Sequence, residues 1–182
     1  MNYYGGKELA HSFRTVRKNT IQIAEDIPED KYGFKPSPES RTVAQTLVHI
    51  AVGTMFPTIV HGGKMSDMNK LDFQEFFGKI NGEESKARNK AEIVALLKTD
   101  GDKFAALLDT MSDPFLAEVV QMRPGGDPPS RTRFDMLLSA KEHEMHHRGQ
   151  LMVMQRMVGV VPHLTRLMQE RMARMQAQAA TT

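Results

Sequence analysis

Apolar residues recur every three or four positions in two segments of the first half of the chain, which is the spacing of a helix with one buried face. The first segment spans residues 9–27 and ends before a proline. The second begins at Thr42, which forms with Gln45 the T-x-x-Q pattern of a capping box. Pro57 and the glycine pair at 62–63 are expected to kink or end this second helix.

Two further helices are predicted in the second half of the chain. One begins at Asn89, again with a capping-box pattern, and its apolar stripe continues to Met111 with an interruption at Gly101. The other begins at Thr132 and extends to about Gly159. The pattern therefore predicts four long helices.

The connections between these helices differ in length. Residues 64–88 form a polar connection with a short helix expected at 72–77, and residues 112–130 indicate a loop rich in proline and glycine. No run alternates clearly between apolar and polar residues, so no strand is predicted. The pattern favours an all-α fold, a four-helix bundle over residues 1–162 with at least one crossover, followed by an amphipathic helix and tail over 163–182.

The composition narrows the class of protein. A chain of 182 residues with 40% hydrophobic and 25% charged residues is typical of one globular domain. No run approaches the roughly 18 apolar residues of a membrane span, and the N-terminus lacks an apolar secretory signal, so a cytoplasmic protein without a membrane partner is expected. The net charge of +2 and the lack of aromatic residues among the C-terminal arginines argue against a nucleic-acid partner. Cysteine is absent, which excludes disulfides, thiolate metal sites and a cysteine nucleophile.

The histidines offer the clearest chemistry. His143 and His147 lie four residues apart on the last long helix, so their rings stack on one face and can share a metal ion. Apolar neighbours indicate that this face points inward, where an unpartnered ring is unfavourable. His49 is the best third candidate because it lies mid-helix among apolar residues. Two alternatives stay open: His49 as a hydrogen-bonded core residue, and the pair as a polar patch facing a partner. His146 is rotated off the face of the pair, and ordinary polar roles are expected for His11, His61 and His163.

The residues at 143–147 also match H-E-x-x-H, the zinc metalloprotease pattern, in which Glu144 is the general base. The extended metzincin pattern needs glycine at 150 and histidine at 153, where this chain has Gln150 and Val153. We interpret the match as accidental, because a helix with histidines four residues apart needs only one glutamate to produce it.

Two stretches resemble the signature of the DinB-like, or YfiT-like, metal-binding proteins: PSPESRTVAQTLVHI at 36–50 and HEMHHRGQL at 143–151. In that family a loop leads into a helix that bears the first histidine, and the last core helix bears H-x-x-x-H followed by R-G-Q. The order and the spacing agree over roughly residues 5–162.

The resemblance implies an up-down-down-up four-helix bundle. It also implies that His49, His143 and His147 hold one divalent metal ion per chain, most often zinc or nickel, with positions open to solvent or substrate. The chain departs from many relatives at Arg41, where they have an aromatic residue. Its C-terminal helix is also longer than the family core requires.

Three neutral histidines leave a divalent ion its charge and an open position, the pattern of a catalytic rather than a structural site. Members of the family similar to this chain include thiol-dependent S-transferases and a thiol-dependent isomerase, and others are described as hydrolases. Because the chain has no cysteine, the leading hypothesis is a metal-dependent transferase that joins a low-molecular-weight thiol to an electrophilic substrate. The alternatives are a metal-dependent hydrolase that uses bound water and a non-enzymatic metal-binding stress or interaction protein.

Three further residues are candidates at the site. Glu144 is a candidate base, and Arg148 is a candidate partner for a substrate carboxylate or for a buried acid. Gln150 is a candidate for orienting a histidine ring or the substrate. A homodimer is expected from the resemblance and from the methionine-rich C-terminal segment.

Overall fold

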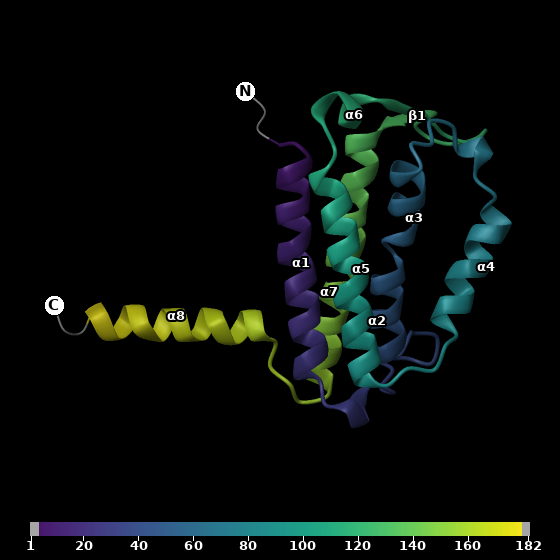
Figure 1. Cartoon of the computed structure of the whole chain (residues 1–182). Helices are drawn as coiled ribbons and strands as arrows, with labels where there is room; N and C mark the ends of the chain where they lie inside the picture. Colours follow the sequence, from purple (N-terminus) through teal and green to yellow (C-terminus); the bar gives the residue numbers. More distant parts are fainter. Residues whose placement is uncertain (1–3, 180–182) are drawn as a thin grey trace.

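Four long helices form a bundle in the computed structural model, which describes residues 4–179. They are α1 (Gly6–Asp26), α2 (Val43–Val52), α5 (Lys90–Asp109) and α7 (Arg133–Met157). Figure 1 shows that α1 and α7 run in one direction and α2 and α5 in the other. Both α1 and α2 pack against α5 and α7. The predicted fold class and the up-down-down-up topology are therefore confirmed.

The predicted caps set where the helices begin. At the start of α2 the Thr42 hydroxyl accepts from the backbone N–H of Gln45 at 3.0 Å, and the Gln45 side chain accepts from the backbone N–H of Thr42 at 2.9 Å. Asn89 and Glu92 make the same pair of bonds at the start of α5. Thr132 caps α7 through the backbone N–H of Asp135. Each cap provides a hydrogen-bond partner for backbone N–H groups of the first turn, and so sets the residue at which its helix begins.

The second helical segment is longer than α2 itself. It continues through α3 (Met55–Pro57) into a π-helical turn, η2 (Thr58–Gly62), as the proline and glycines predicted. The run Val43–Gly62 has a mean hydropathy of 1.5, and by length and composition it could cross a membrane, contrary to the sequence-based expectation. The segment lies within the bundle, and 56% of it is buried. Its high hydropathy is that of a core helix, which is apolar on several sides because it contacts several neighbouring helices.

The connections carry more structure than the sequence predicted. Residues 64–88 contain η3 (Met68–Lys70) and the 12-residue α4 (Phe73–Glu84), which is longer than the helix expected at 72–77. Phe76 is the only buried residue of α4, so the sequence of this helix shows little of the apolar repeat from which a helix is predicted. A short 3₁₀ turn, η1 (Glu29–Lys31), follows α1.

The expectation of a plain loop without strands at 112–130 is wrong. That segment contains α6 (Asp113–Ala117) and β1 (Val119–Gln121), which pairs antiparallel with β2 (Ser130–Thr132). Strands of three residues are too short to show an alternating pattern.

A buried ion pair joins all four long helices. Arg17 of α1 donates through Nε to both carboxylate oxygens of Glu144 on α7, at 3.0 and 3.1 Å. Its remaining nitrogens donate to the carbonyl oxygens of Leu97 on α5 and Ile50 on α2. Arg17 and Glu144 are only 3% and 2% exposed. A Cβ at Gly101 would lie 2.8 Å from Arg17 Cγ, so the glycine that interrupts the α5 stripe makes room for this arginine.

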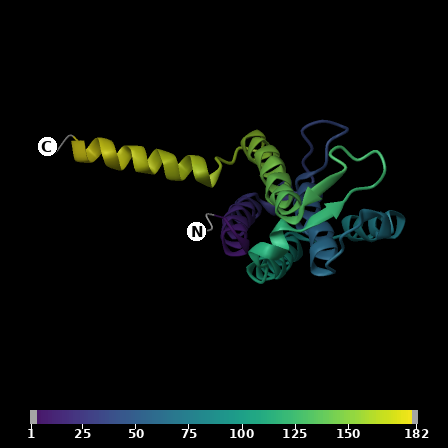
Figure 2. The ribbon, with the colours of Figure 1, turned by 90° about the horizontal axis from the view of Figure 1, so that it is seen from above.

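The last helix, α8 (His163–Ala179), projects away from the bundle (Figures 1 and 2). Its start is held by an ion pair between Arg166 and Asp26 at 2.8 Å and a contact of 3.2 Å between His163 Nε2 and the Asn19 side chain. Residues 180–182 of the expected tail lie outside the described residues. The expected homodimer stays a prediction. Several apolar side chains of α8 are exposed: Leu167, Met168, Met172 and Met175.

His61 is a core residue, not the ordinary polar residue expected from the sequence. Its ring is 2% exposed in η2, with Nδ1 3.4 Å from Nη1 of the buried Arg133. Burial, reinforced by the charge of Arg133, lowers the pKa of His61 from 6.5 to about 4. The neutral ring is therefore the form that the fold accommodates.

We expect Arg17→Met to lower the free energy of unfolding by about 3–5 kcal/mol, because it leaves the Glu144 carboxylate buried without its partner. The double variant Arg17→Met/Glu144→Leu should lose clearly less than the sum of the two single losses. Denaturant unfolding measures the free energy of unfolding of Arg17→Met, Glu144→Leu and the double variant. Arg14→Met, which removes the exposed pair with Asp109, is the matched control and should change stability by less than about 1 kcal/mol. Additive losses at Arg17 and Glu144 would contradict the coupling.

A second prediction concerns pH. In the unfolded chain His61 takes up a proton below about pH 6.5, whereas in the folded chain it does so only near pH 4. The free energy of unfolding therefore falls as the pH is lowered from 6.5 to 4. The shift corresponds to roughly 3 kcal/mol at most. His61→Gln, which keeps an acceptor for Arg133, should show a shallower decline in unfolding free energy between these pH values. An identical decline in variant and wild type would show that His61 does not titrate in this way.

Candidate metal centre

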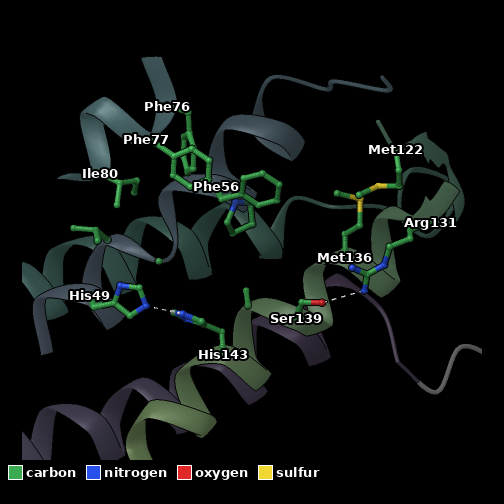
Figure 3. Close-up of a pocket in the computed structure, with 14 residues that line it drawn as sticks. His49, Phe56, Phe76, Phe77, Ile80, Met122, Arg131, Met136, Ser139 and His143 are labelled. Atoms are coloured by element: carbon green, nitrogen blue, oxygen red, sulfur yellow. Dashed lines mark hydrogen bonds between the residues drawn. The ribbon is translucent and has the colours of Figure 1, made fainter. Parts of the chain in front are cut away.

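Three histidine rings from two helices converge on one point, which we call the three-histidine centre: His49 of α2 with His143 and His147 of α7. One ring nitrogen from each lies within 4.8 Å of the others. The Nε2 atoms of His49 and His143 are 3.0 Å apart, and the three ring centroids are 4.6 to 4.9 Å from one another. Figure 3 shows the rings of His49 and His143 pointing toward each other across the gap between the helices. The structure thus brings together the three ligands that the sequence suggested.

Two polar side chains orient the rings. Nδ1 of His49 donates to the carboxylate of Glu84, at the end of α4, at 2.6 Å. Nδ1 of His147 donates to Oε1 of Gln150 at 2.8 Å, and the amide nitrogen of Gln150 lies 3.1 Å from Nε2 of His146. With Nδ1 of His49 and His147 protonated, Nε2 of each carries the lone pair that binds a metal.

The ring of His143 packs closely against the backbone at Gly53. A Cβ at Gly53 would lie 3.0 Å from Cε1 of His143 and 3.1 Å from its Nδ1, so a side chain at position 53 would push against the ring. Burial, with smaller contributions from the neighbouring histidines and Arg41, lowers the pKa of His143 to about 4. The pKa of His147 is also lowered, chiefly by burial. These two rings are neutral at pH 7, the form that coordinates a metal.

The donor set fits a divalent ion. Zinc–nitrogen bonds of about 2.0–2.1 Å place two ligands of one tetrahedral ion roughly 3.4 Å apart. The Nε2 atoms of His49 and His143 are 3.0 Å apart, which is close to that spacing. No cysteine is present, and within residues 4–179 the cluster that could hold a metal consists of these three histidines. A centre of three imidazole ligands leaves a coordination position open, which suits a catalytic ion better than a structural one.

The other candidates lie in different surroundings. Glu144 lies on the core side of α7 in its ion pair with Arg17, so the structure does not bring this carboxylate to the centre. Arg148 has a buried Nε without a hydrogen-bond partner among the described residues, and it makes no ion pair there. Gln150 accepts a hydrogen bond from His147, in line with the orienting role suggested by the sequence. The side chain of His146 is exposed.

Glu84 is the residue that the sequence did not reveal. It lies 35 positions from His49, at the end of a helix whose length was underestimated. The signal that could have pointed to it is the Asp72 cap, which starts α4.

Two cavities open on the centre. The first, of about 440 Å³, lies between α3, α4 and α7 and reaches His49 and His143. We call it the aromatic cavity because its wall opposite α7 carries Phe56, Phe76 and Phe77 (Figure 3). The second, of about 680 Å³, lies between the loop before α2 and the later part of α7, and it reaches His147. We call it the polar cavity; its other lining residues are Pro36, Glu39, Ser40, Arg41, Thr46, Gln150, Val153 and Met154.

The chain matches the model of the DinB family over residues 1–179. The protein belongs to the DinB family. It is 25% identical to YjoA of Bacillus subtilis (strain 168), an uncharacterized protein, over 153 residues, which are 84% of this chain and 90% of YjoA. The crystal structure of YjoA matches with a TM-score of 0.63 and 24% identity over 84% of this chain and 92% of that one.

Two other solved structures share the fold of this DinB-family protein. YfiT from Bacillus subtilis, described as a probable metal-dependent hydrolase, matches with a TM-score of 0.66 and 16% identity over 88% of this chain and 91% of YfiT. A mycothiol-dependent maleylpyruvate isomerase matches with a TM-score of 0.61 and 12% identity, and the match covers 81% of this chain but 61% of the isomerase. At such identities these likenesses establish the bundle fold.

The geometry of the centre predicts how it binds metal. After loading with zinc or nickel, we expect about one ion per wild-type chain by elemental analysis and none in His147→Ala. Glu84→Gln removes the carboxylate that orients His49, so metal affinity in a competition titration should fall about 10–100-fold. Glu75→Gln, an exposed change on the same helix, is the control and should bind as wild type does. Unchanged affinity in Glu84→Gln would contradict the orienting role.

Proposed function

We propose that this DinB-family protein is a metal-dependent enzyme that joins a low-molecular-weight thiol to an electrophilic substrate. The observation that carries the proposal is the three-histidine centre, with His143 and His147 held neutral and cavities open on two sides, in a chain without cysteine. The thiol must then come from outside the chain.

His49, His143 and His147 would hold the ion. A divalent ion held there would lower the pKa of a bound thiol or water, and so would supply a nucleophile at neutral pH. The chain's own residues keep the rings in place through Glu84 and Gln150. Zinc and nickel are the ions we propose, although geometry and metal supply select the ion more strongly than imidazole ligands do.

The carboxylates around the centre favour a thiol over water as the nucleophile. Water-activating metal sites commonly place a free glutamate beside the ion as a general base. Here Glu84 is bonded to His49, and Glu144 is paired with Arg17 on the far side of α7. The unpaired Glu39 is an exposed residue of the loop before α2, and no hydrogen bond joins it to a histidine of the centre. A thiol needs less help, because its pKa of about 8.5 is already close to neutral.

The comparisons support both the leading proposal and its alternative. One structural neighbour is described as mycothiol-dependent, which is thiol chemistry on this fold. Another is described as a probable metal-dependent hydrolase, which keeps hydrolysis by bound water as the second candidate. A cytoplasmic location, where small thiols are kept reduced, would suit the leading proposal.

The test is thiol consumption with chlorodinitrobenzene as the model electrophile and a panel of cellular thiols that includes cysteine and glutathione. In this reaction the sulfur–carbon bond forms, the carbon–chlorine bond breaks, chloride leaves with its electron pair, and the thiol proton passes to the buffer. We expect a rate above background with zinc- or nickel-loaded protein, and none after chelation or in His147→Ala.

Hydrolysis of a nitrophenyl ester, measured without thiol, tests the alternative that the protein is a metal-dependent hydrolase. Metal-dependent ester hydrolysis with no metal-dependent thiol consumption would replace the proposal with the hydrolase. Activity in neither assay, in protein shown to contain the ion, would favour the non-enzymatic metal-binding protein.

A further inference from the structure

The two cavities approach the three-histidine centre from opposite directions along α7. The aromatic cavity is lined by residues that precede and include His143: Met136, Ser139 and Ala140. The polar cavity is lined by His147 and by residues that follow it: Gln150, Val153 and Met154. The two cavities share no lining residue. Two molecules can therefore approach the same centre from two sides.

The polar cavity presents two opposite charges that the fold leaves unpaired. Arg41 and Glu39 both line it, and within residues 4–179 neither side chain makes a hydrogen bond or an ion pair. Arg41 lines the same cavity as His147, so its guanidinium lies on the side of the centre that this cavity reaches. A guanidinium and a carboxylate in a cavity that opens on the three-histidine centre are complementary to a ligand that carries a carboxylate and an ammonium group.

The aromatic cavity has the opposite character. Phe77 lines it with 54% of its surface exposed, and its ring packs against Phe76 at a centroid distance of 5.3 Å. The charge that the cavity contains, Arg131, is already offset, because its Nε donates to Asp135 at 2.6 Å. Figure 3 shows this arginine beyond Ser139, at the far end of the cavity from the histidines. An apolar molecule without net charge gains most from entering such a space.

Resting on the proposed function, we infer that the cavities divide the two substrates. The polar cavity takes a thiol of the amino-acid class, whose carboxylate pairs with Arg41 and whose ammonium group pairs with Glu39. The aromatic cavity takes the apolar body of the electrophile against Phe56, Phe76 and Phe77. The sulfur and the electrophilic carbon then meet at the three-histidine centre.

The experiment compares three thiols that differ only in their charged groups: cysteine, cysteamine without the carboxylate, and mercaptopropionate without the ammonium group. In the metal-loaded enzyme, Arg41→Leu should raise KM about tenfold for cysteine and mercaptopropionate and leave cysteamine unchanged. Glu39→Gln should raise KM for cysteine and cysteamine and leave mercaptopropionate unchanged. Phe77→Ala should raise KM for chlorodinitrobenzene and leave every thiol unchanged.

Controls separate these effects from general damage. Lys35→Leu removes an exposed cation from the same loop, outside the cavity, and should change no KM. Arg41→Lys should recover part of the affinity for cysteine, because it restores the charge without the planar fork. Thermal unfolding of each variant should match wild type, since Arg41, Glu39 and Phe77 are exposed.

A binding measurement distinguishes this inference from the proposed function. Serine carries the charges of cysteine without the thiol, and its binding to the metal-loaded protein is measured by calorimetry without any reaction. Serine binding that weakens in Arg41→Leu and in Glu39→Gln supports the cavity assignment even if no thiol transfer occurs. Thiol transfer with equal KM for all three thiols, unaffected by Arg41→Leu, would overturn the assignment while leaving the proposed function in place.

Discussion

The buried ion pair between Arg17 and Glu144 is the interaction on which the bundle and its centre both depend. Arg17 bonds to Glu144 and to the carbonyl oxygen of Ile50, and these two residues directly follow His143 and His49 in the chain. A single guanidinium on α1 therefore fixes the relative heights of the two helices that carry the histidines. Two charges in an apolar interior are tolerated only with good partners, so alternative registers of these helices are disfavoured.

The same pair separates the two faces of α7. Glu144 faces the core and His143 and His147 face the gap beside α2, although all three lie within five residues. The residues of the metalloprotease pattern are thus divided between the buried ion pair and the three-histidine centre. A sequence pattern specifies chemistry only when the fold places its members on the same side of the helix.

The surroundings of the centre come from short or peripheral elements. Glu84 comes from the end of α4, Gly53 from the turn after α2, and Arg41 from the loop before it. The core helices supply a rigid frame for the rings, and the connections supply what orients them and what faces a ligand.

Helix positions and the candidate ligand pair on α7 could be predicted because they depend on local patterns. Capping residues such as Thr42 and Asn89 act within one turn, and the spacing of His143 and His147 is set by the helix period. The full length of α4, the short strands and Glu84 were missed, because a mostly exposed helix and three-residue strands leave little apolar period. His61 and His163 are buried, with 2% and 8% of their surface exposed, although the sequence predicted ordinary polar roles for both. Burial depends on what packs over a side chain, which the sequence does not show.

The sequence by itself determined a bundle of helices, the starts of three of its long helices and three histidines suited to one metal ion. Only the tertiary structure decided that Glu84 and Gln150 orient two of these rings, that Glu144 belongs to the core, and that two cavities of opposite character meet at the centre. Helical periodicity and capping act over a few neighbouring residues, whereas ring orientation, burial and cavity lining depend on contacts between segments tens of residues apart.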